Sequence, residues 1–367
     1  MTAAALRHAP VKVIEDWLTA IFAAVGLPEA EARATAENLV LADLSGHPSH
    51  GIARTARYVQ WAQEGRQRPV AHVTELMRTG PLALLDAHRS FGQIAGIRAC
   101  DVAAEIAREH GAAIVGLRKS GHLGRIGHWA ERLAAQGLWS IHWVNVAGSR
   151  LVAPFGGMDR RLGTNPVAVG VPRPDAAEGD GPFILDFATS RVAEGKVLVA
   201  LQSGKPLPGD AMVDAEGADS TDPVTLYGLS ARSEVQDPRM GPGALQTMGQ
   251  HKGSGLAVAC DLLAGALIGS DDNADPQAQF CNGMLSIVID PARFGDPTAI
   301  AAQAGDFIAH IRASAPRAGD PVLTPGDPER VGRARGAVEG VPLSAGLLKS
   351  LHEASARTGV APAVPAG

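Results

Sequence analysis

The feature that most constrains the fold is a change of periodicity near Pro69. Before it, apolar residues recur at helical spacing in three successive segments, at about residues 13–25, 28–44 and 52–64. After it, short apolar runs typical of strands are mixed with helical segments and separated by glycine or proline turns. The chain is therefore expected to form a small helical lobe followed by a larger lobe that contains a sheet.

The order of the expected elements argues against a regular β-α-β repeat. Strands are expected at residues 82–85, 112–117, 138–146, 166–172, 183–187 and 284–289, and helices at 94–109, 126–136, 252–268 and about 300–311. Because several strands follow one another without a helix between them, the pattern favours an α+β fold over a doubly wound parallel sheet. The stretch 204–242, rich in glycine, proline and aspartate, is expected to be mostly loop.

The late amphipathic segment at 300–311 is expected to return to the N-terminal helices. The helical lobe would then be discontinuous, with residues 1–72 and about 297–367, and residues 73–296 would form the α+β lobe. A chain of 367 residues is long enough for two lobes, each with its own core.

Composition and charge indicate which partners and which compartment to expect. The net charge of −5 lacks the basic excess that nucleic-acid binding requires. The sequence shows neither a signal-peptide pattern nor an apolar run long enough to cross a bilayer. The three cysteines are widely spaced, which favours buried thiols in a reducing compartment over disulfides or a zinc site. We therefore expect a cytoplasmic protein that binds neither nucleic acid nor membranes.

A glycine-rich turn separates the strand expected at 112–117 from the next helix. It reads Gly-His-Leu-Gly-Arg-Ile-Gly from Gly121 to Gly127. Free amides at a helix start favour phosphate or carboxylate, and glycines allow close approach of a ligand. The spacing differs from the dinucleotide-binding pattern G-x-G-x-x-G, and no acidic residue follows where a ribose ligand would be expected. A purely structural tight turn is the alternative.

A second motif, at Ser49, His50 and Arg54, combines groups suited to 2-hydroxy acid chemistry. Arg54 follows His50 by four residues, so the two can share a helical face. An imidazole can exchange a proton with a substrate oxygen, and a guanidinium can hold a carboxylate. The alternative is that Ser49 only caps the helix and His50 is a surface group. A metal site at His47 and His50 lacks a nearby third ligand, so we expect no metal.

Two further segments are candidates for ligand contacts. Asp186 lies near the end of an expected strand and is followed by small residues, a position where ligands are often bound. Lys252 lies in His-Lys-Gly-Ser-Gly at a helix start, which can bind a phosphate. The alternatives are structural roles. Asp186 would accept hydrogen bonds from loop amides, and the segment at Lys252 would be a flexible helix cap.

Taken together, these motifs resemble the malate/L-lactate dehydrogenase family of the second type, which includes ureidoglycolate, sulfolactate and hydroxycarboxylate dehydrogenases, diketogulonate reductase and piperideine-carboxylate reductase. The matching segments, in the family's order, are GHPSHGIAR, SGHLGRIGHWAE, VAPFGG, RLGTNP, LDFATS, AEGKV, HKGSGLA and LTPGDPER. They cover nearly the whole chain, and eight in order are far more specific than any one alone.

The resemblance implies an NAD- or NADP-dependent oxidoreductase that interconverts a small 2-hydroxy acid and its 2-oxo acid. It implies a homodimer, a non-Rossmann cofactor lobe with a mixed sheet, and a helical lobe built from both chain ends. His50 would exchange the substrate proton beside Ser49, with His122 as a competing base, and Arg54 and Thr164 would bind the substrate. The implied cofactor contacts are His122, Leu123, Gly124, Arg125, Ile126, Asp186, Phe187, Ala188, Lys252, Gly326, Asp327 and Pro328.

The sequence departs from the family pattern at three places. Asp327 stands where the family usually has glutamate, which keeps a carboxylate. Val146 replaces a common serine, which removes one hydroxyl from the expected cofactor pocket. Lys196 stands where imine-reducing relatives have aspartate, which favours hydroxy-acid chemistry over imine chemistry. The alternatives are a cyclic-imine reductase (piperideine- or pyrroline-2-carboxylate), a diketogulonate-type reductase, or a non-catalytic nucleotide-binding protein.

Overall fold

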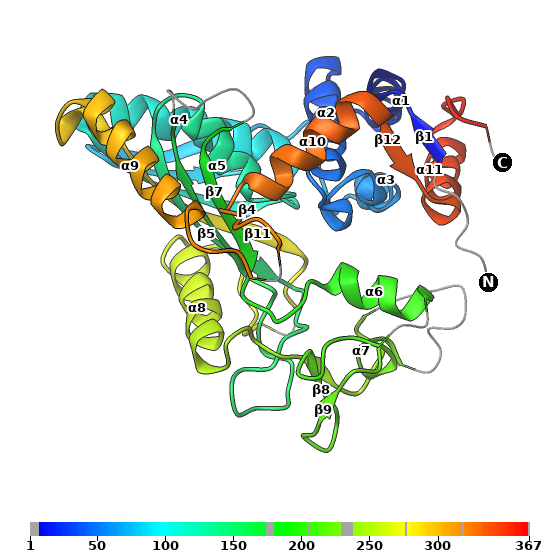
Figure 1. The fold of residues 1–367 in the computed structure, drawn as a ribbon. Coiled ribbons are helices and arrows are strands. Elements are labelled where there is room, and N and C mark those ends of the chain that lie inside the picture. The colour runs from blue at the N-terminus through cyan, green and yellow to red at the C-terminus, as the bar shows by residue number, and fades with distance from the viewer. Residues whose placement is uncertain are drawn as a thin grey trace.

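The computed structural model describes residues 7–173, 180–203, 206–228, 238–275, 277–317 and 319–365. Figure 1 shows the N-terminal and last helices at one end of the molecule, a large sheet with its helices at the other, and a smaller third part beside them. Among the described helices, none is long and apolar enough to cross a membrane.

Apolar residues at helical spacing bury one face of each N-terminal helix. The helices are α1 (Val11–Ala24), α2 (Glu29–Leu44) and α3 (Thr55–Gln63). In α1, Ile14, Leu18 and Ile21 are fully buried. They share one core with Leu39 of α2 and Tyr58 of α3. Each fully buried aliphatic side chain of this kind stabilises the fold by roughly 1.5–3 kcal/mol.

The end of the chain packs on these helices. β12 (Val341–Leu343) pairs antiparallel with β1 (Arg7–Ala9). α10 (Asp327–Glu339) packs on α2, and α11 (Ala345–Thr358) packs on α1 and α3. The indole of Trp17 donates a hydrogen bond of 2.8 Å to the hydroxyl of Ser355. Both chain ends therefore contribute to one core, while the exact limits of the helical lobe stay a prediction.

The late helix α9 (Pro297–Arg312) lies elsewhere than the sequence analysis expected. It lies beside the large sheet, away from α1, α2 and α3 (Figure 1). Within α9 only Ile308 is buried, whereas Phe307 is 65% exposed. Periodicity identified an amphipathic face but could not identify the surface that receives it, and α10 and α11 pack on the N-terminal helices instead.

The large sheet is mixed, as expected, and has seven strands in the order β2-β3-β4-β11-β5-β6-β7 in the described part of the chain. The strands are β2 (Thr74–Thr79), β3 (Leu82–Asp86), β4 (Ala112–Ser120), β5 (Trp139–Ala147), β6 (Pro166–Val171), β7 (Phe183–Ala188) and β11 (Cys281–Ile289). β3 and β4 run parallel, and every other neighbouring pair is antiparallel. This order is not that of a Rossmann sheet.

Alternation along the strands creates two buried faces. Leu85, Val144 and Met284 pack against α4 (Gly92–His110) and α5 (Gly127–Ala134) in the largest core. Their neighbours in sequence point the other way, and Leu285 packs against the π-helical turn Leu262–Ala266 that follows α8 (His251–Asp261). Because successive side chains of a strand face opposite sides, each strand contributes to both layers.

The stretch expected to be mostly loop contains a small folded unit where the structure describes it. β8 (Met212–Val213), β9 (Asp219–Ser220) and β10 (Ala244–Leu245) form a sheet beside α6 (Glu194–Ser203) and α7 (Val224–Tyr227). Leu226 and Tyr227 are buried in its core. The strands are two residues long, too short for a periodic signal, so the sequence analysis missed them.

Two glycines in helices provide a matched test of this packing. A Cβ on Gly96 in α4 would lie 2.3 Å from a ring carbon of the buried Trp129, whereas a Cβ on Gly255 in α8 would have no heavy atom within 4 Å. We expect Gly96→Ala to lower the free energy of unfolding by about 1–3 kcal/mol. Gly255→Ala should raise it by about 0.5–1 kcal/mol. Urea unfolding measures both, and a shift of the same sign in the two variants would contradict the packing described.

Candidate active site

A buried carboxylate accepts a hydrogen bond from the loop between α2 and α3 and fixes its position. Two short 3₁₀ turns, Pro48–His50 and Ile52–Arg54, make up this loop. The amide of Ile52 donates a hydrogen bond of 2.6 Å to Oδ2 of Asp43 in α2. A Cβ on Gly51 would lie 1.8 Å from the same oxygen, so the close approach of loop and carboxylate requires glycine.

Ser49, His50 and Arg54 lie together on this loop. Oγ of Ser49 is 2.9 Å from Nδ1 of His50. Nε of Arg54 donates to the carbonyl oxygen of Ser49, and its Nη2 lies 3.7 Å from Glu194 at the start of α6. Gly195 also packs on Ser49, since a Cβ there would lie 2.5 Å from the serine Cβ. The loop and α6 therefore form one wall of the site.

His122 reaches the same site from the turn after β4. Its ring stacks on the ring of His50, with centroids 5.6 Å apart and planes at 19°. The hydroxyl of Tyr58 lies 2.6 Å from Nδ1 of His122, and Nε2 of Gln93 donates to the same hydroxyl at 3.3 Å. In both imidazoles a hydroxyl group thus contacts Nδ1, and Nε2 has no hydrogen bond to another described residue, so Nε2 is left for a ligand.

Burial keeps both imidazoles neutral. It lowers the pKa of His50 to about 3, and the positive charges of Arg54 and Arg125 add to the effect. Burial also lowers the pKa of His122 well below its ordinary value, again with help from the positive charge of Arg54. Burial raises the pKa of the Tyr58 hydroxyl to about 12, so this group keeps its proton.

The glycine-rich turn after His122 is anchored by two side chains from distant strands. Oδ1 of Asn282 in β11 accepts a hydrogen bond from the amide of Leu123, and Oδ2 of Asp186 in β7 accepts one of 2.7 Å from the amide of Gly127. Burial raises the pKa of Asp186, while Gly127 and Arg125 oppose the shift. The turn residues Leu123, Gly124, Arg125 and Ile126 are buried.

Within this turn, the guanidinium of Arg125 has one nitrogen without a hydrogen-bond acceptor in the described part of the chain. Its guanidinium pairs with Glu131, but its Nη1 is buried and has no hydrogen-bond partner among the described residues. A Cβ on Gly127 would lie 2.7 Å from this Nη1 and 3.0 Å from Asp186. A buried cationic donor without a partner is costly, so the arrangement fits an anionic group such as a cofactor phosphate.

Lys252 and Thr164 lie in segments that backbone hydrogen bonds connect to the end of β7. Lys252 is exposed in the first turn of α8. The amide of Met248, just before that turn, bonds to the carbonyl of Thr189, whose own amide bonds to the carbonyl of Thr164. Phe187 and Ala188, at the end of β7, pair with β6. These residues form a second cluster, for which the structure records no direct hydrogen bond to His50 or His122.

The Gly326–Pro328 segment lies at the start of α10 beside β7. The carbonyl of Pro325 accepts a hydrogen bond from Ile184. The carboxylate of Asp327 is bound by Arg312, Arg330 and Thr324. Although burial opposes it, the hydrogen bonds from Thr324 and the two arginines lower the pKa of Asp327. Asp327 therefore has protein partners already, and its expected cofactor role stays a prediction.

The sequence analysis missed several residues that shape the site. Tyr58 follows Arg54 by four residues on one helical segment, and it is one of two tyrosines in the chain, so a signal was present. Asp43 and Asn282 gave no signal, because their partners are loop amides rather than side chains at a recognisable spacing. The described residues contain no cluster of three or more histidine, cysteine, aspartate or glutamate side chains suited to a metal ion.

The pH dependence of stability tests the role of Asp43. Burial raises the pKa of Asp43 to about 7, against the hydrogen bond from Ile52. From about pH 4 to pH 7 the unfolded chain loses this proton while the folded chain keeps it, so the free energy of unfolding falls as pH rises.

We expect Asp43→Asn, which keeps an oxygen for the Ile52 amide, to flatten this dependence by about 2 kcal/mol between about pH 5 and pH 7.5. Urea unfolding at both pH values measures the change. Parallel pH profiles for the wild-type and variant proteins would contradict the assigned pKa.

Comparisons with known proteins agree with the motifs. Residues 10–352 match the family model for malate/L-lactate dehydrogenase. The chain is 37% identical over 354 residues to hydroxycarboxylate dehydrogenase B of Escherichia coli O157:H7, covering 95% of this chain and 94% of that protein.

Two solved structures share the fold. The sulfolactate dehydrogenase from Methanocaldococcus jannaschii has a TM-score of 0.83 and 27% identity, with 97% of this chain and 98% of that chain covered. The delta1-piperideine-2-carboxylate reductase from Pseudomonas syringae pvar. tomato has a TM-score of 0.81 and 28% identity, with 95% and 99% covered. Family model, sequence and fold agree over nearly the whole length, and the chain belongs to the malate/L-lactate dehydrogenase family.

Proposed function

We propose that this protein is an NAD- or NADP-dependent oxidoreductase that interconverts a small 2-hydroxy acid and its 2-oxo acid. The observation that carries the proposal is the pair of stacked, neutral imidazoles of His50 and His122 beside the guanidinium of Arg54. A bound nicotinamide would supply or accept the hydride at C2 of the substrate. The protein must then move one proton at the substrate oxygen and hold the substrate carboxylate.

Arg54 and Thr164 are the proposed substrate-binding groups. Nε of Arg54 is used by Ser49, and Nη2 has only a long contact of 3.7 Å to Glu194, so the guanidinium retains donors for a carboxylate. The hydroxyl of Thr164 makes no hydrogen bond to another described residue, while its carbonyl is fixed by Thr189.

The hydrogen bonds support different roles for the two imidazoles. The hydroxyl of Tyr58 accepts from Gln93 and keeps its own proton, which it can donate to Nδ1 of His122. His122 then carries its proton on Nε2 and serves as a hydrogen-bond donor to the substrate oxygen.

His50 is the proposed proton-exchange residue. Oγ of Ser49 can accept a hydrogen bond from Nδ1 of His50, which leaves a lone pair on Nε2 to take the proton of a substrate hydroxyl. A bound carboxylate beside the ring raises the pKa of the imidazole, because an opposite charge favours the protonated form. The same group can therefore return the proton in the reducing direction.

The cofactor groove is proposed to include the turn after His122 and the end of β7. Nη1 of Arg125 lacks a partner among the described residues, and Asp186 faces the same turn. The proposal keeps as cofactor contacts His122 to Ile126, Asp186 to Ala188, Lys252 and Gly326 to Pro328. A cationic donor without a partner suits the pyrophosphate of either NAD or NADP.

A homodimer in the cytoplasm is part of the proposal. α8 together with the π-helical turn after it, and α9, expose apolar side chains at helical spacing, Val258 with Leu262 and Phe307 with Ile311, which a second copy can cover. The three cysteines are buried and free, which agrees with a reducing compartment.

The second candidate function is reduction of a cyclic imine, supported by the fold shared with the piperideine-carboxylate reductase. A diketogulonate-type reductase would use the same site, and a non-catalytic nucleotide-binding protein would not need both imidazoles. A panel of 2-oxo acids and cyclic imines, each with NADH and NADPH, distinguishes these functions by loss of nicotinamide absorbance. We expect turnover of a 2-oxo acid. Turnover of imines alone, or cofactor binding without turnover, would overturn the proposal.

A matched pair of substitutions tests the two imidazole roles. Glutamine can donate a hydrogen bond but cannot take up and release a proton. We expect His50→Gln to lower kcat by about 10²–10⁴-fold, the usual worth of a general acid–base group. His122→Gln should lose about tenfold or less, since an amide donor remains. Steady-state kinetics on folded variants measure both, and the reverse ranking would assign proton exchange to His122.

A further inference from the structure

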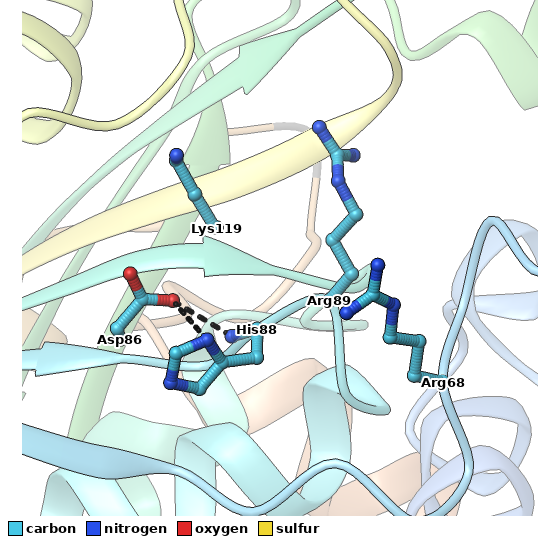
Figure 2. A pocket seen from close by; sticks show the side chains of 5 residues that line it. All are labelled: Arg68, Asp86, His88, Arg89 and Lys119. Atoms are coloured by element: carbon cyan, nitrogen blue, oxygen red, sulfur yellow. Dashed lines mark hydrogen bonds and ion pairs between the residues drawn. The ribbon is translucent and has the colours of Figure 1, made fainter.

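A second group of charged residues lines a pocket at the carboxyl ends of β3 and β4, the two parallel strands of the large sheet. The pocket encloses about 220 Å³ and is lined by Arg68, Asp86, His88, Arg89 and Lys119. Asp86 ends β3 and Lys119 lies near the end of β4, which runs parallel to β3. The carboxyl ends of parallel strands are a common place for ligands. Figure 2 shows Lys119 and Arg89 extending toward the same side, with Arg68 beside Arg89.

The positive charges of this pocket exceed the negative charges that face them. Asp86 pairs with Arg118 at 2.8 Å, and Asp271 pairs with Arg89 at 2.7 Å. The side chains of Arg68 and Lys119 make no hydrogen bond or ion pair with any described residue. After both carboxylates are paired, two cationic side chains are therefore left over at the pocket.

The backbone of the pocket is strained. His88, Arg89 and Lys119 have φ values of +50°, +63° and +52°, and they are three of the five non-glycine residues with positive φ in the described ranges. Residues other than glycine rarely adopt such conformations, and those that do cluster at ligand-binding sites. Hydrogen bonds hold them in place, because Arg89 donates to the carbonyl of Lys119 and Arg68 donates to the carbonyl of Arg89.

We infer that Arg68, Arg89 and Lys119 form a binding site for a compact dianionic phosphate group, outside the proposed substrate site. Two unpaired cations and the guanidinium of Arg89 match the charge and the acceptors of phosphate. The volume of about 220 Å³ is below the range of about 300–1,000 Å³ typical of pockets for larger ligands, so it suits a compact group. The source is either free phosphate or a small phosphorylated metabolite.

The pocket is connected to the site of the two imidazoles through Phe280. Nη1 of Arg89 donates to the carbonyl of Phe280 at 3.3 Å. The ring of Phe280 stacks on Trp61 with centroids 4.8 Å apart and lies 5.9 Å from the ring of His122. A phosphate that draws Arg89 toward itself therefore alters the surroundings of Trp61 and His122.

Titration calorimetry of the full-length protein with inorganic phosphate tests the site, with saturating NADH or NADPH present to fill the proposed cofactor groove. Sodium chloride at equal ionic strength is the reference. We expect Lys119→Gln and Arg68→Gln each to weaken phosphate binding by at least about tenfold. Lys349→Gln, which removes an exposed lysine of α11, should leave binding unchanged. Glycerol 3-phosphate forms a second arm, and tighter binding of this ester identifies a phosphorylated metabolite as the ligand.

Two results would overturn the inference. One is the absence of phosphate binding beyond the chloride reference, and the other is binding that neither Arg68→Gln nor Lys119→Gln weakens. Arg68 is exposed and its backbone is unstrained, so its variant stays informative even if Lys119→Gln fails to fold. Tryptophan emission gives a readout independent of catalysis. Phosphate should shift it in the wild-type protein and not in Trp61→Phe, and an equal shift in both would contradict the connection through Phe280.

Discussion

The position of β11 between β4 and β5 is the constraint on which the rest of the structure depends. This late strand pairs antiparallel with both neighbours along most of its length. At its start, Asn282 accepts a hydrogen bond from the amide of Leu123 and donates one to the carbonyl of Asn145. Phe280, just before the strand, packs beside His122. A slip of one residue in this register would turn Asn282 to the other face of the sheet and release the glycine-rich turn.

The chemistry of the site follows from burial combined with hydroxyl partners. Each imidazole is neutral because removal from water disfavours its charged form. Each has Nδ1 beside a hydroxyl, from Ser49 or Tyr58, so the ring orientation is fixed and Nε2 is left for a ligand. Ser49 can accept a hydrogen bond from His50, whereas the hydroxyl of Tyr58 already accepts one from Gln93, and this difference is the basis of the different proton roles proposed for the two rings.

The proposed phosphate site and the two imidazoles are attached to the same short segments of chain. Lys119 precedes His122 by three residues, and the amide of Gly121 between them bonds to Ser90, next to Arg89. The backbone strain of the pocket is thus held by the segment that also positions His122. The same end of the sheet therefore carries both the proposed phosphate site and one of the imidazoles of the proposed active site.

The sequence alone predicted the mixed α+β class, most of the element types and the groups to which the proposed chemistry is assigned. Periodicity predicted most helices and long strands, and the spacing of Ser49, His50 and Arg54 placed three groups on one loop. The meeting of His50 with His122, the partners Tyr58 and Asp43, and the location of α9 were decided by tertiary structure. The physical reason is that periodicity and spacing report which residues share one element, whereas these contacts join elements whose order in space depends on which apolar surface each one covers.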